Sequence, residues 1–300
     1  MSGQDGGIRP FASVIVPVFR GMRDLPSCLA ALERQDYPAS GFEVVVVDNG
    51  DNPGIEGCVA ACGHAVLVRE SHPSSYAARN RGIDVARGDI LAFTDADCVP
   101  APGWLAAGVA AFDDGRIGLV GGRIDVHVRD RARPSAAELY ERTTMFLQER
   151  NVERGHFAQT ANAFVRRDVI RAVGPFDAAI TSGGDTEFGQ RVHAAGFGLA
   201  YADAASVVHV SHRGVADLLQ RRRRVAGGHH QRMRSGSDRE WPRTLYRGTF
   251  RFLRLLSDRP ASAPRDLPSL GRVLAVELLL AGGYAAERAR LMLGGRPRRA

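Results

Sequence analysis

The chain has 300 residues, of which 44% are hydrophobic and 24% charged, and its formal net charge is +7. A chain of this length and composition can bury a large core, which excludes a protein disordered throughout. The first ten residues, MSGQDGGIRP, are polar and do not form the apolar centre of a secretory signal. The four cysteines form no CxxC pair, so we expect reduced thiols in a cytoplasmic protein.

Positive charge is concentrated near the C-terminus. Residues 1–210 hold 20 arginines and 26 acidic residues, a net charge of −6, whereas residues 211–300 hold 20 arginines and 7 acidic residues, a net charge of +13. The chain has no lysine, so these cations are all guanidinium groups. A basic segment of this kind attracts phosphate on nucleic acid, on anionic lipid or on a substrate.

The first hundred residues alternate between predicted strands and helices. The β-branched run over 13–18 is typical of a parallel strand that is buried on both faces. We expect further strands at 42–48, 65–69 and 89–94, and helices at 22–35, 55–62 and 74–87. This alternation predicts an α/β fold with a doubly wound, mostly parallel sheet and flanking helices. Ligands bind beyond the carboxyl ends of such strands, where Asp48 and Asp95 fall.

The second half of the chain is expected to add strands and helices to this sheet. Helices are predicted over 102–113, 135–150, 168–173 and 185–195, and strands over 118–128, 157–165, 196–201 and 206–209. After residue 212 we expect a basic helical extension over 213–300. It would contain an Arg-rich helix that includes residues 221–224, an amphipathic helix over 244–256 and an apolar helix over 273–293.

Two carboxylates, Asp95 and Asp97, stand one residue apart directly after an apolar strand. On an extended segment their side chains would point to the same side, where like charges repel unless a cation lies between them. The pair therefore predicts a site for Mg²⁺ or Mn²⁺, with room for phosphate oxygens. The alternative is two exposed carboxylates that cap the next helix.

Six motifs in a fixed order resemble a family 2 glycosyltransferase of the GT-A fold over about residues 12–210. They are VIVPVFRG (14–21), VVVVDNG (44–50), YAARNRGIDVARGDILAFTDADC (76–98), GLVGGRI (118–124), TANAFVRRDVIRAVGPFD (160–177) and GGDTEFGQRVHAAGFGLAYADAASVVH (183–209). The resemblance implies a glycosyltransferase domain over 1–212, with a donor half at about 12–98 and an acceptor half at about 118–210.

The resemblance also implies roles for residues of the donor half. A nucleotide-sugar donor would bind there, with Asp48 at the base, Arg79 near the donor, and Asp97 as the direct ligand of the metal. His209 would add a metal or phosphate contact, or would be a packed polar residue. The donor-binding residues implied by the motifs are Pro17, Val18, Phe19, Asp48, Arg79, Asp95, Ala96 and Asp97, and the metal ligands are Asp95, Asp97 and His209.

Asp185 is the candidate catalytic residue. It precedes a predicted helix and could cap it, and the resemblance implies that it is also the general base for the acceptor hydroxyl. The family usually has Glu before this Asp. Here Gly184 replaces it, which leaves Asp185 as the sole base candidate. Asn162 and Gly184 are implied on the acceptor side. Tyr76 and Trp104 could stack on the base or the sugar, but their helix and strand spacing is more typical of core residues.

These features together predict an inverting, metal-dependent enzyme that moves one sugar to a hydroxyl of a lipid-linked or cell-envelope glycan. Residues 220–224 read Gln-Arg-Arg-Arg-Arg and lack the Trp of the Q-x-x-R-W element of processive relatives, which favours a single transfer. Arg20 and the Asn49-Gly50-Asp51 stretch depart from the family pattern, so the nucleotide base stays open. The sequence leaves two alternative functions open: a sugar nucleotidylyltransferase, and a non-catalytic protein that binds phosphate or lipid on the same scaffold.

The basic extension allows several partners. It would suit peripheral contact with an anionic membrane at the cytoplasmic face, or it would pack on the catalytic domain or on a second copy of the chain in a homodimer. In related enzymes an Arg-rich segment folds over the donor phosphates, which implies Arg223 or Arg224 here. We expect no nucleic-acid partner.

Overall fold

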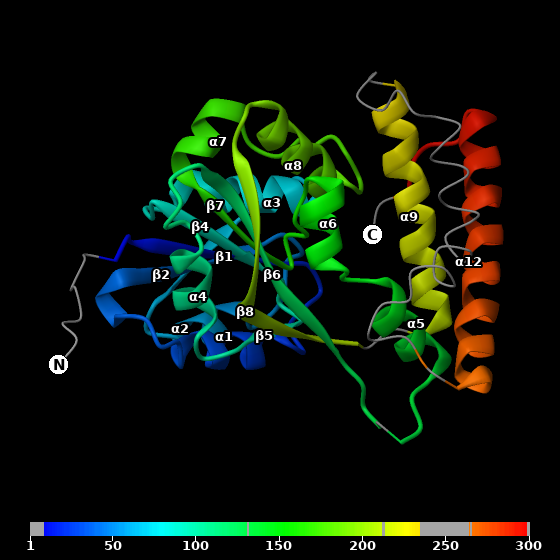
Figure 1. The fold of residues 1–300 in the computed structure, drawn as a ribbon, viewed down its shortest axis with the longest axis horizontal. Coiled ribbons are helices and arrows are strands. Elements are labelled where there is room, and N and C mark those ends of the chain that lie inside the picture. The colour runs from blue at the N-terminus through cyan, green and yellow to red at the C-terminus, as the bar shows by residue number, and fades with distance from the viewer. Residues whose placement is uncertain (1–8, 131, 212–213, 235–263, 265, 299–300) are drawn as a thin grey trace.

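The computed structural model describes residues 9–298 apart from 131, 212–213, 235–263 and 265. Its centre is an eight-stranded sheet in the order β3-β2-β1-β4-β7-β6-β8-β5 (Figure 1). The strands are β1 Ala12–Val18, β2 Phe42–Asp48, β3 Ala65–Arg69, β4 Ile90–Thr94, β5 Cys98–Pro100, β6 Ile117–His127, β7 Asn162–Arg166 and β8 Gly198–Val210. The described helices are α1 Leu25–Glu33, η1 Ala39–Gly41, α2 Ile55–Ala60, α3 Ser75–Val85, α4 Trp104–Ala110, α5 Ala136–Thr144, α6 Gln148–Gly155, α7 Arg167–Val173, α8 Gly184–Ala194, α9 Val215–Arg234 and α12 Leu267–Met292.

The first four strands form one continuous parallel part of the sheet, and β6 and β8 form a further parallel pair. β1 pairs in parallel with β2 and β4, and β2 pairs in parallel with β3. Successive side chains of β1 point to opposite faces: Val14 and Val16 join one core cluster and Ile15 joins the other. Both faces are therefore apolar, which is why the sequence reads as an unbroken run. The predicted α/β class and mostly parallel sheet are confirmed.

The later strands differ from the sequence-based expectation in two places. The strand predicted over 157–165 begins only at Asn162, and residues 157–161 precede it as loop and turn. The two strands predicted over 196–201 and 206–209 form one strand, β8. Its register against β6 shifts between Ala202 and Ser206, so the turn expected there is an irregularity inside a continuous strand.

The helix predicted over 135–150 is divided into α5 and α6. The backbone of Phe146, between the two, has φ +58°, which a helix does not tolerate. α5 begins with a capping box in which Ser135 and Glu138 bond each other's backbone amides. The break places residues 144–147 beside the cavity described below.

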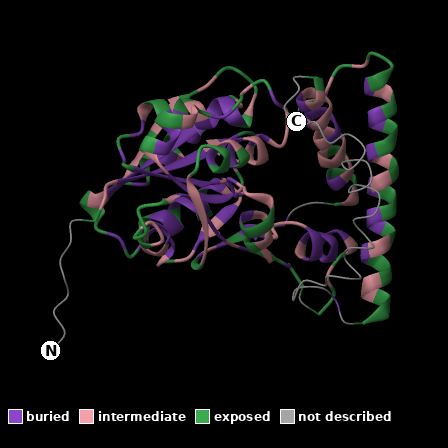
Figure 2. Cartoon of the chain, turned by 45° about the horizontal axis from the view of Figure 1, so that its top comes forward, coloured by how far each residue is buried: buried purple, intermediate pink, exposed green. Residues whose placement is uncertain are grey.

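The C-terminal extension forms two described helices, α9 and α12. They lie side by side, with α9 between the sheet and α12 (Figures 1 and 2). Together with α5 they share a small apolar core that includes Tyr140, Leu218 and Leu280. Glu277 of α12 is buried there, accepts a hydrogen bond from the Tyr140 hydroxyl and pairs with Arg222 of α9 at 3.4 Å. These contacts fix α9 and α12 relative to the body of the protein.

Some expectations for the extension fall on residues that the structure does not describe. The amphipathic helix expected over 244–256 lies outside the described residues, and so do positions 212 and 213, where we placed the domain boundary. That division remains a prediction. Among the described helices, α12 alone is long and apolar enough to cross a membrane.

The close packing of α4 on the sheet yields a stability prediction. A Cβ at Gly108 would lie 2.1 Å from the ring of buried Phe164, so we expect Gly108→Ala to lower the free energy of unfolding by about 1–3 kcal/mol, the range for overpacked cores. Denaturant unfolding would measure it. Gly57→Ala is the control: its Cβ meets nothing within 4 Å, and we expect it to raise that free energy by up to about 1 kcal/mol. Equal effects of the two variants would contradict the packing described here.

Candidate active site

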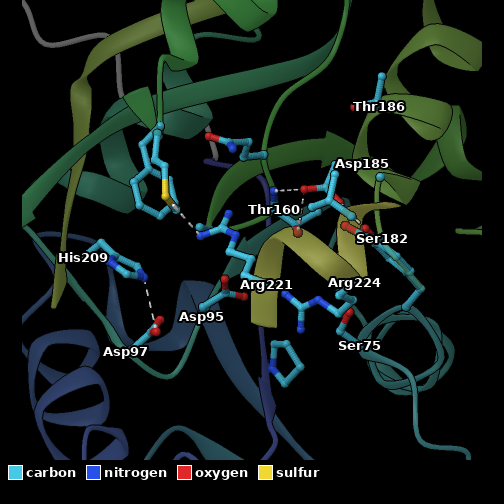
Figure 3. A pocket seen from close by; sticks show the side chains of 18 of the residues that line it. Ser75, Asp95, Asp97, Thr160, Ser182, Asp185, Thr186, His209, Arg221 and Arg224 are labelled. Atoms are coloured by element: carbon cyan, nitrogen blue, oxygen red, sulfur yellow. Dashed lines mark hydrogen bonds and ion pairs between the residues drawn. The ribbon is translucent and has the colours of Figure 1, made fainter. Parts of the chain in front are cut away.

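A cavity of about 1100 Å³ lies beyond the carboxyl ends of β1 and β4 (Figure 3). Its walls come from the loop after β1, the turn after β4, the start of α3, the segments 144–147 and 157–161, the start of α8, and the helices α9 and α12. α/β proteins bind ligands in the crevice beyond the carboxyl ends of their parallel strands. The cavity is therefore the candidate site.

Most of the predicted donor-side residues line this cavity. They are Pro17, Val18, Phe19, Arg79, Asp95, Ala96 and Asp97. Asp48 does not line it. The carboxylate of Asp48 is buried and accepts hydrogen bonds within its own loop, from the Gly50 amide at 3.1 Å and the Asn52 side-chain amide at 2.7 Å. Asn49, the next residue, reaches the cavity instead.

The two carboxylates after β4 each have an ion-pair partner of their own, Arg79 for Asp95 and His209 for Asp97. Residues 95–97 form a turn, so the alternation expected of an extended segment does not apply. Asp95 pairs with Arg79 at 2.5 Å, and the guanidinium of Arg79 is itself buried. Burial raises the pKa of Asp95, the Arg79 guanidinium opposes that rise, and the nearby Asp97 adds to it. Positive charge near Asp97 would relieve this repulsion.

Asp97 lies beside His209, whose Nε2 is 3.2 Å from its Oδ2 (Figure 3). The antiparallel pairing of β5 with β8 brings them together, because Cys98 lies opposite His209 in that ladder. His209 is buried against the Phe146 ring, and among the described residues its Nδ1 has no hydrogen-bond partner. A carboxylate that faces the Nε2 of an imidazole fits a divalent cation whose other ligands are phosphate oxygens and water. Within the described residues, no three His, Cys, Asp or Glu side chains gather to form a complete metal cage.

Asp185 lies on the opposite side of the cavity from Asp97 and His209 (Figure 3). The cap expected of it is not formed: Gly183, with φ +84°, is the N-cap of α8, and Asp185 stands in the first turn. Its Oδ1 accepts a hydrogen bond from the Tyr76 hydroxyl at 2.7 Å, and its Oδ2 accepts from the Thr160 amide at 3.3 Å. The carboxylate is therefore held at the cavity wall.

Tyr76 and Thr160 are site residues that sequence reasoning missed. Tyr76 was expected in the core, and its ring is indeed buried, but its hydroxyl reaches both Asp185 and the Gly184 amide. A signal existed in the spacing, since Tyr76 and Arg79 are three residues apart on α3 and share one face. The contact of Tyr76 with Asp185 spans 109 residues and could not be read from the sequence.

Asn162, predicted on the acceptor side, does not line the cavity. It is fully buried at the start of β7, where its Oδ1 accepts a hydrogen bond from the Trp104 indole at 2.8 Å. Its amide nitrogen donates to the backbone oxygens of Arg123 and Ala205, both at 2.8 Å. Asn162 thus stabilises the irregular stretch between β6 and β8, and Trp104 lies in the core as expected.

Helix α9 supplies guanidinium groups to the cavity. Arg221, Arg222, Arg224 and Arg232 line it, and Arg223 does not. Figure 3 shows Arg221 and Arg224 among the side chains that line the cavity with Asp95 and Ser75. Of the two arginines implied by resemblance, Arg224 therefore reaches the cavity, and Arg221 was not expected there. A concave site lined by several guanidinium groups attracts an anionic ligand.

The chain matches known proteins along most of its length. The model of glycosyl transferase family 2 matches residues 13–174. Glycosyltransferase AglE of Haloferax volcanii is 37% identical over 227 residues, which cover 74% of each chain. Pre-mycofactocin glycosyltransferase of Mycobacterium tuberculosis is 30% identical over 220 residues, which cover 70% of this chain and 45% of that protein.

Solved structures share the fold. The mannosyltransferase PcManGT from Pyrobaculum calidifontis, in complex with GDP-Man and Mn²⁺, superposes with a TM-score of 0.60 at 20% identity and covers 98% of this chain and 78% of its own. S. aureus TarS 1–349 in complex with UDP-GlcNAc superposes with a TM-score of 0.54 at 17% identity, covering 96% and 93%. The family model and the similarity to AglE show that the chain belongs to glycosyltransferase family 2, and the solved structures show that it has the GT-A fold.

Proposed function

We propose that this protein transfers one sugar, with inversion at the anomeric carbon, from a nucleotide-sugar donor to a hydroxyl of an acceptor. The supporting observation is that one cavity holds Asp97 and His209 on one side and Asp185 on the other (Figure 3). Membership of glycosyltransferase family 2 supports a transferase over a nucleotidylyltransferase. We therefore assign binding of the donor and the metal to the side of Asp97 and His209, and activation of the acceptor to the side of Asp185.

The donor diphosphate would lie between the turn after β4 and α9. Arg221 and Arg224 would contact its phosphates, because guanidinium groups bind phosphate oxygens through several N–H donors. Asp97 and His209 would hold a Mn²⁺ or Mg²⁺ ion, which neutralises charge on the leaving diphosphate when it is bound. Arg79 pairs with Asp95 and orients its carboxylate beside this site.

Asp185 would act on the acceptor. Its carboxylate takes the proton of the acceptor hydroxyl, whose oxygen forms a bond to the anomeric carbon. The bond from that carbon to the diphosphate oxygen breaks, and its electron pair leaves with the nucleoside diphosphate. Attack from the side opposite the leaving group inverts the anomeric centre, and this agrees with the placement of Asp185 across the cavity from Asp97 (Figure 3).

The acceptor is proposed to be a lipid-linked or cell-envelope glycan at the cytoplasmic face of a membrane. Two observations on the C-terminal extension support this setting. Leu278 and Leu279 are 64% and 52% exposed on α12, whose other face packs against α9 and α5. Residues 211–300 as a whole carry a net charge of +13, and exposed apolar side chains on a basic segment suit an anionic bilayer surface.

The metal-side assignment predicts that Asp97→Asn weakens Mn²⁺-dependent binding of the donor nucleotide by about 100-fold or more, beyond the loss usual for a residue that only supports a ligand. Calorimetric titration with UDP, GDP and dTDP, with and without Mn²⁺, would measure this and would identify the base. Asp114→Asn is the matched control, because Asp114 is exposed and pairs with Arg116. Unchanged metal-dependent binding in Asp97→Asn would contradict the assignment.

The acceptor-side assignment predicts that Asp185→Asn leaves the donor dissociation constant unchanged and lowers the transfer rate by about 10²- to 10⁴-fold, the usual contribution of a general base. The rate is followed as nucleoside diphosphate released in the presence of polyprenyl-phosphate-linked sugars. Glu187→Gln, two residues along α8, should retain transfer because Glu187 pairs with Arg191. Normal transfer by Asp185→Asn would remove Asp185 as the base.

The membrane assignment predicts that the double variant Leu278→Asp, Leu279→Asp no longer sediments with phosphatidylglycerol vesicles, while the parent chain does so and does not sediment with phosphatidylcholine vesicles. Both positions are exposed, so the variant should keep the unfolding midpoint of the parent. Light scattering tests whether a second copy of the chain binds this face of α12 instead of a membrane. If the parent chain is a dimer, the variant is a monomer and neither binds vesicles, the face is a dimer interface and the membrane assignment is wrong.

A further inference from the structure

The Tyr76 hydroxyl bridges two groups of α8. It lies 2.7 Å from Oδ1 of Asp185 and 2.8 Å from the backbone nitrogen of Gly184. A backbone N–H can only donate, so the Tyr76 oxygen accepts from Gly184 and its own O–H points at Asp185. Burial and the Asp185 charge raise the pKa of Tyr76, so the phenol stays protonated and remains a donor. The direction of this hydrogen bond is thus fixed by the geometry.

The ring of Tyr76 is held from behind. It stacks on Phe176 with ring centroids 5.9 Å apart, and Phe176 packs against Phe93 of β4 and Phe188 of α8. Asn80, four residues along α3, bonds both the carbonyl and the amide of Phe176, at 2.8 and 3.0 Å. Because α3 is tied to the segment before α8 in this way, the hydroxyl cannot easily swing away from Asp185.

Gly184 gives the ring its room. A Cβ at this position would lie 2.7 Å from Cζ of Tyr76, closer than real Cβ contacts. The replacement of the family's usual Glu by Gly184 therefore has a local reason, since the tyrosine ring occupies the space in which a side chain would begin. Tyr76 and Gly184 are a matched pair.

The second oxygen of Asp185 is also held. Oδ2 accepts from the Thr160 amide at 3.3 Å and lies 3.5 Å from the Thr160 hydroxyl. With donors on both oxygens, the plane of the carboxylate is set. Arg79, one turn beyond Tyr76 on α3, holds Asp95 on the donor side. One helix therefore positions a carboxylate on each side of the cavity.

We propose that Tyr76 is a positioning residue for sugar transfer: its hydroxyl, in the space left by Gly184, orients the Asp185 carboxylate toward the acceptor oxygen. This inference rests on the proposed role of Asp185 as the general base. Tyr76 acts through Asp185 and does not touch the reacting atoms. Its effect should therefore appear in the rate of transfer, while binding of the donor is spared.

The first test is Tyr76→Phe, which keeps the ring and removes the hydroxyl. We expect kcat to fall by about 10- to 100-fold, the effect of losing one hydrogen bond to a charged group, with the donor dissociation constant and the unfolding midpoint close to those of the parent. A structural role alone would lower the unfolding midpoint and leave kcat near that of the parent. Full kcat in Tyr76→Phe would overturn the proposal, and so would a loss confined to donor affinity.

Two further variants separate this inference from the function on which it rests. In Gly184→Ala the new Cβ would displace the Tyr76 ring and so move its hydroxyl away from Asp185, which should lower kcat as much as Tyr76→Phe does. The Tyr76→Phe, Gly184→Ala double variant should show no additional fall in kcat. In an Asp185→Asn background, Tyr76→Phe should cause no further loss. A further loss there would show that Tyr76 acts independently of Asp185. Normal transfer by Asp185→Asn alone would refute the proposed function itself, whereas a large loss in Asp185→Asn with full activity in Tyr76→Phe would refute only the positioning role.

Discussion

The ion pair between the buried Arg79 guanidinium and the partly exposed Asp95 carboxylate is the interaction on which the rest of the site depends. Carboxylates that stand close together repel, and burial makes the charged form costlier. Arg79 meets Asp95 at 2.5 Å from within the core, on a helix whose first turn also carries Tyr76. Removing the Asp95 carboxylate would leave the charge of Arg79 buried without this counter-charge, which costs more than an exposed ion pair is worth. The same helix, which begins at its Ser74 N-cap, carries the Tyr76 hydroxyl that meets Asp185.

Sheet topology performs the corresponding task on the metal side. The short strand β5 pairs antiparallel with the end of β8, and that ladder sets His209 opposite Cys98 and beside Asp97. The buried Asn162 supports the same region, because it bonds the backbone of β6 and β8 where their register shifts. A polar residue in the core thus acts on the site at a distance, by holding the strand that carries His209.

Helix α9 brings the positive charge of the C-terminal extension to the cavity of the acidic domain. The first 210 residues are mildly acidic and the remaining 90 strongly basic, and α9 folds back so that Arg221 and Arg224 reach the cavity that holds Asp95 and Asp97. The buried contact of Glu277 with Arg222 and Tyr140 keeps α9 in this position. A site with carboxylates at its base and guanidinium groups above them favours a ligand that carries both phosphate and a bound cation.

The sequence by itself determined the α/β class, the first four strands and the presence of Arg79, Asp95, Asp97 and Asp185, because apolar runs and short motifs express local preferences. Only the tertiary structure decided which of these side chains meet. In the structure, residues 95–97 form a turn and are not extended. Asp48 and Asn162 are buried and do not line the cavity, whereas Tyr76, Thr160 and Arg221 do. The physical reason is that hydrogen bonds such as that from Tyr76 to Asp185 join residues 109 apart in the chain, and no local pattern records which distant partner a polar side chain will find.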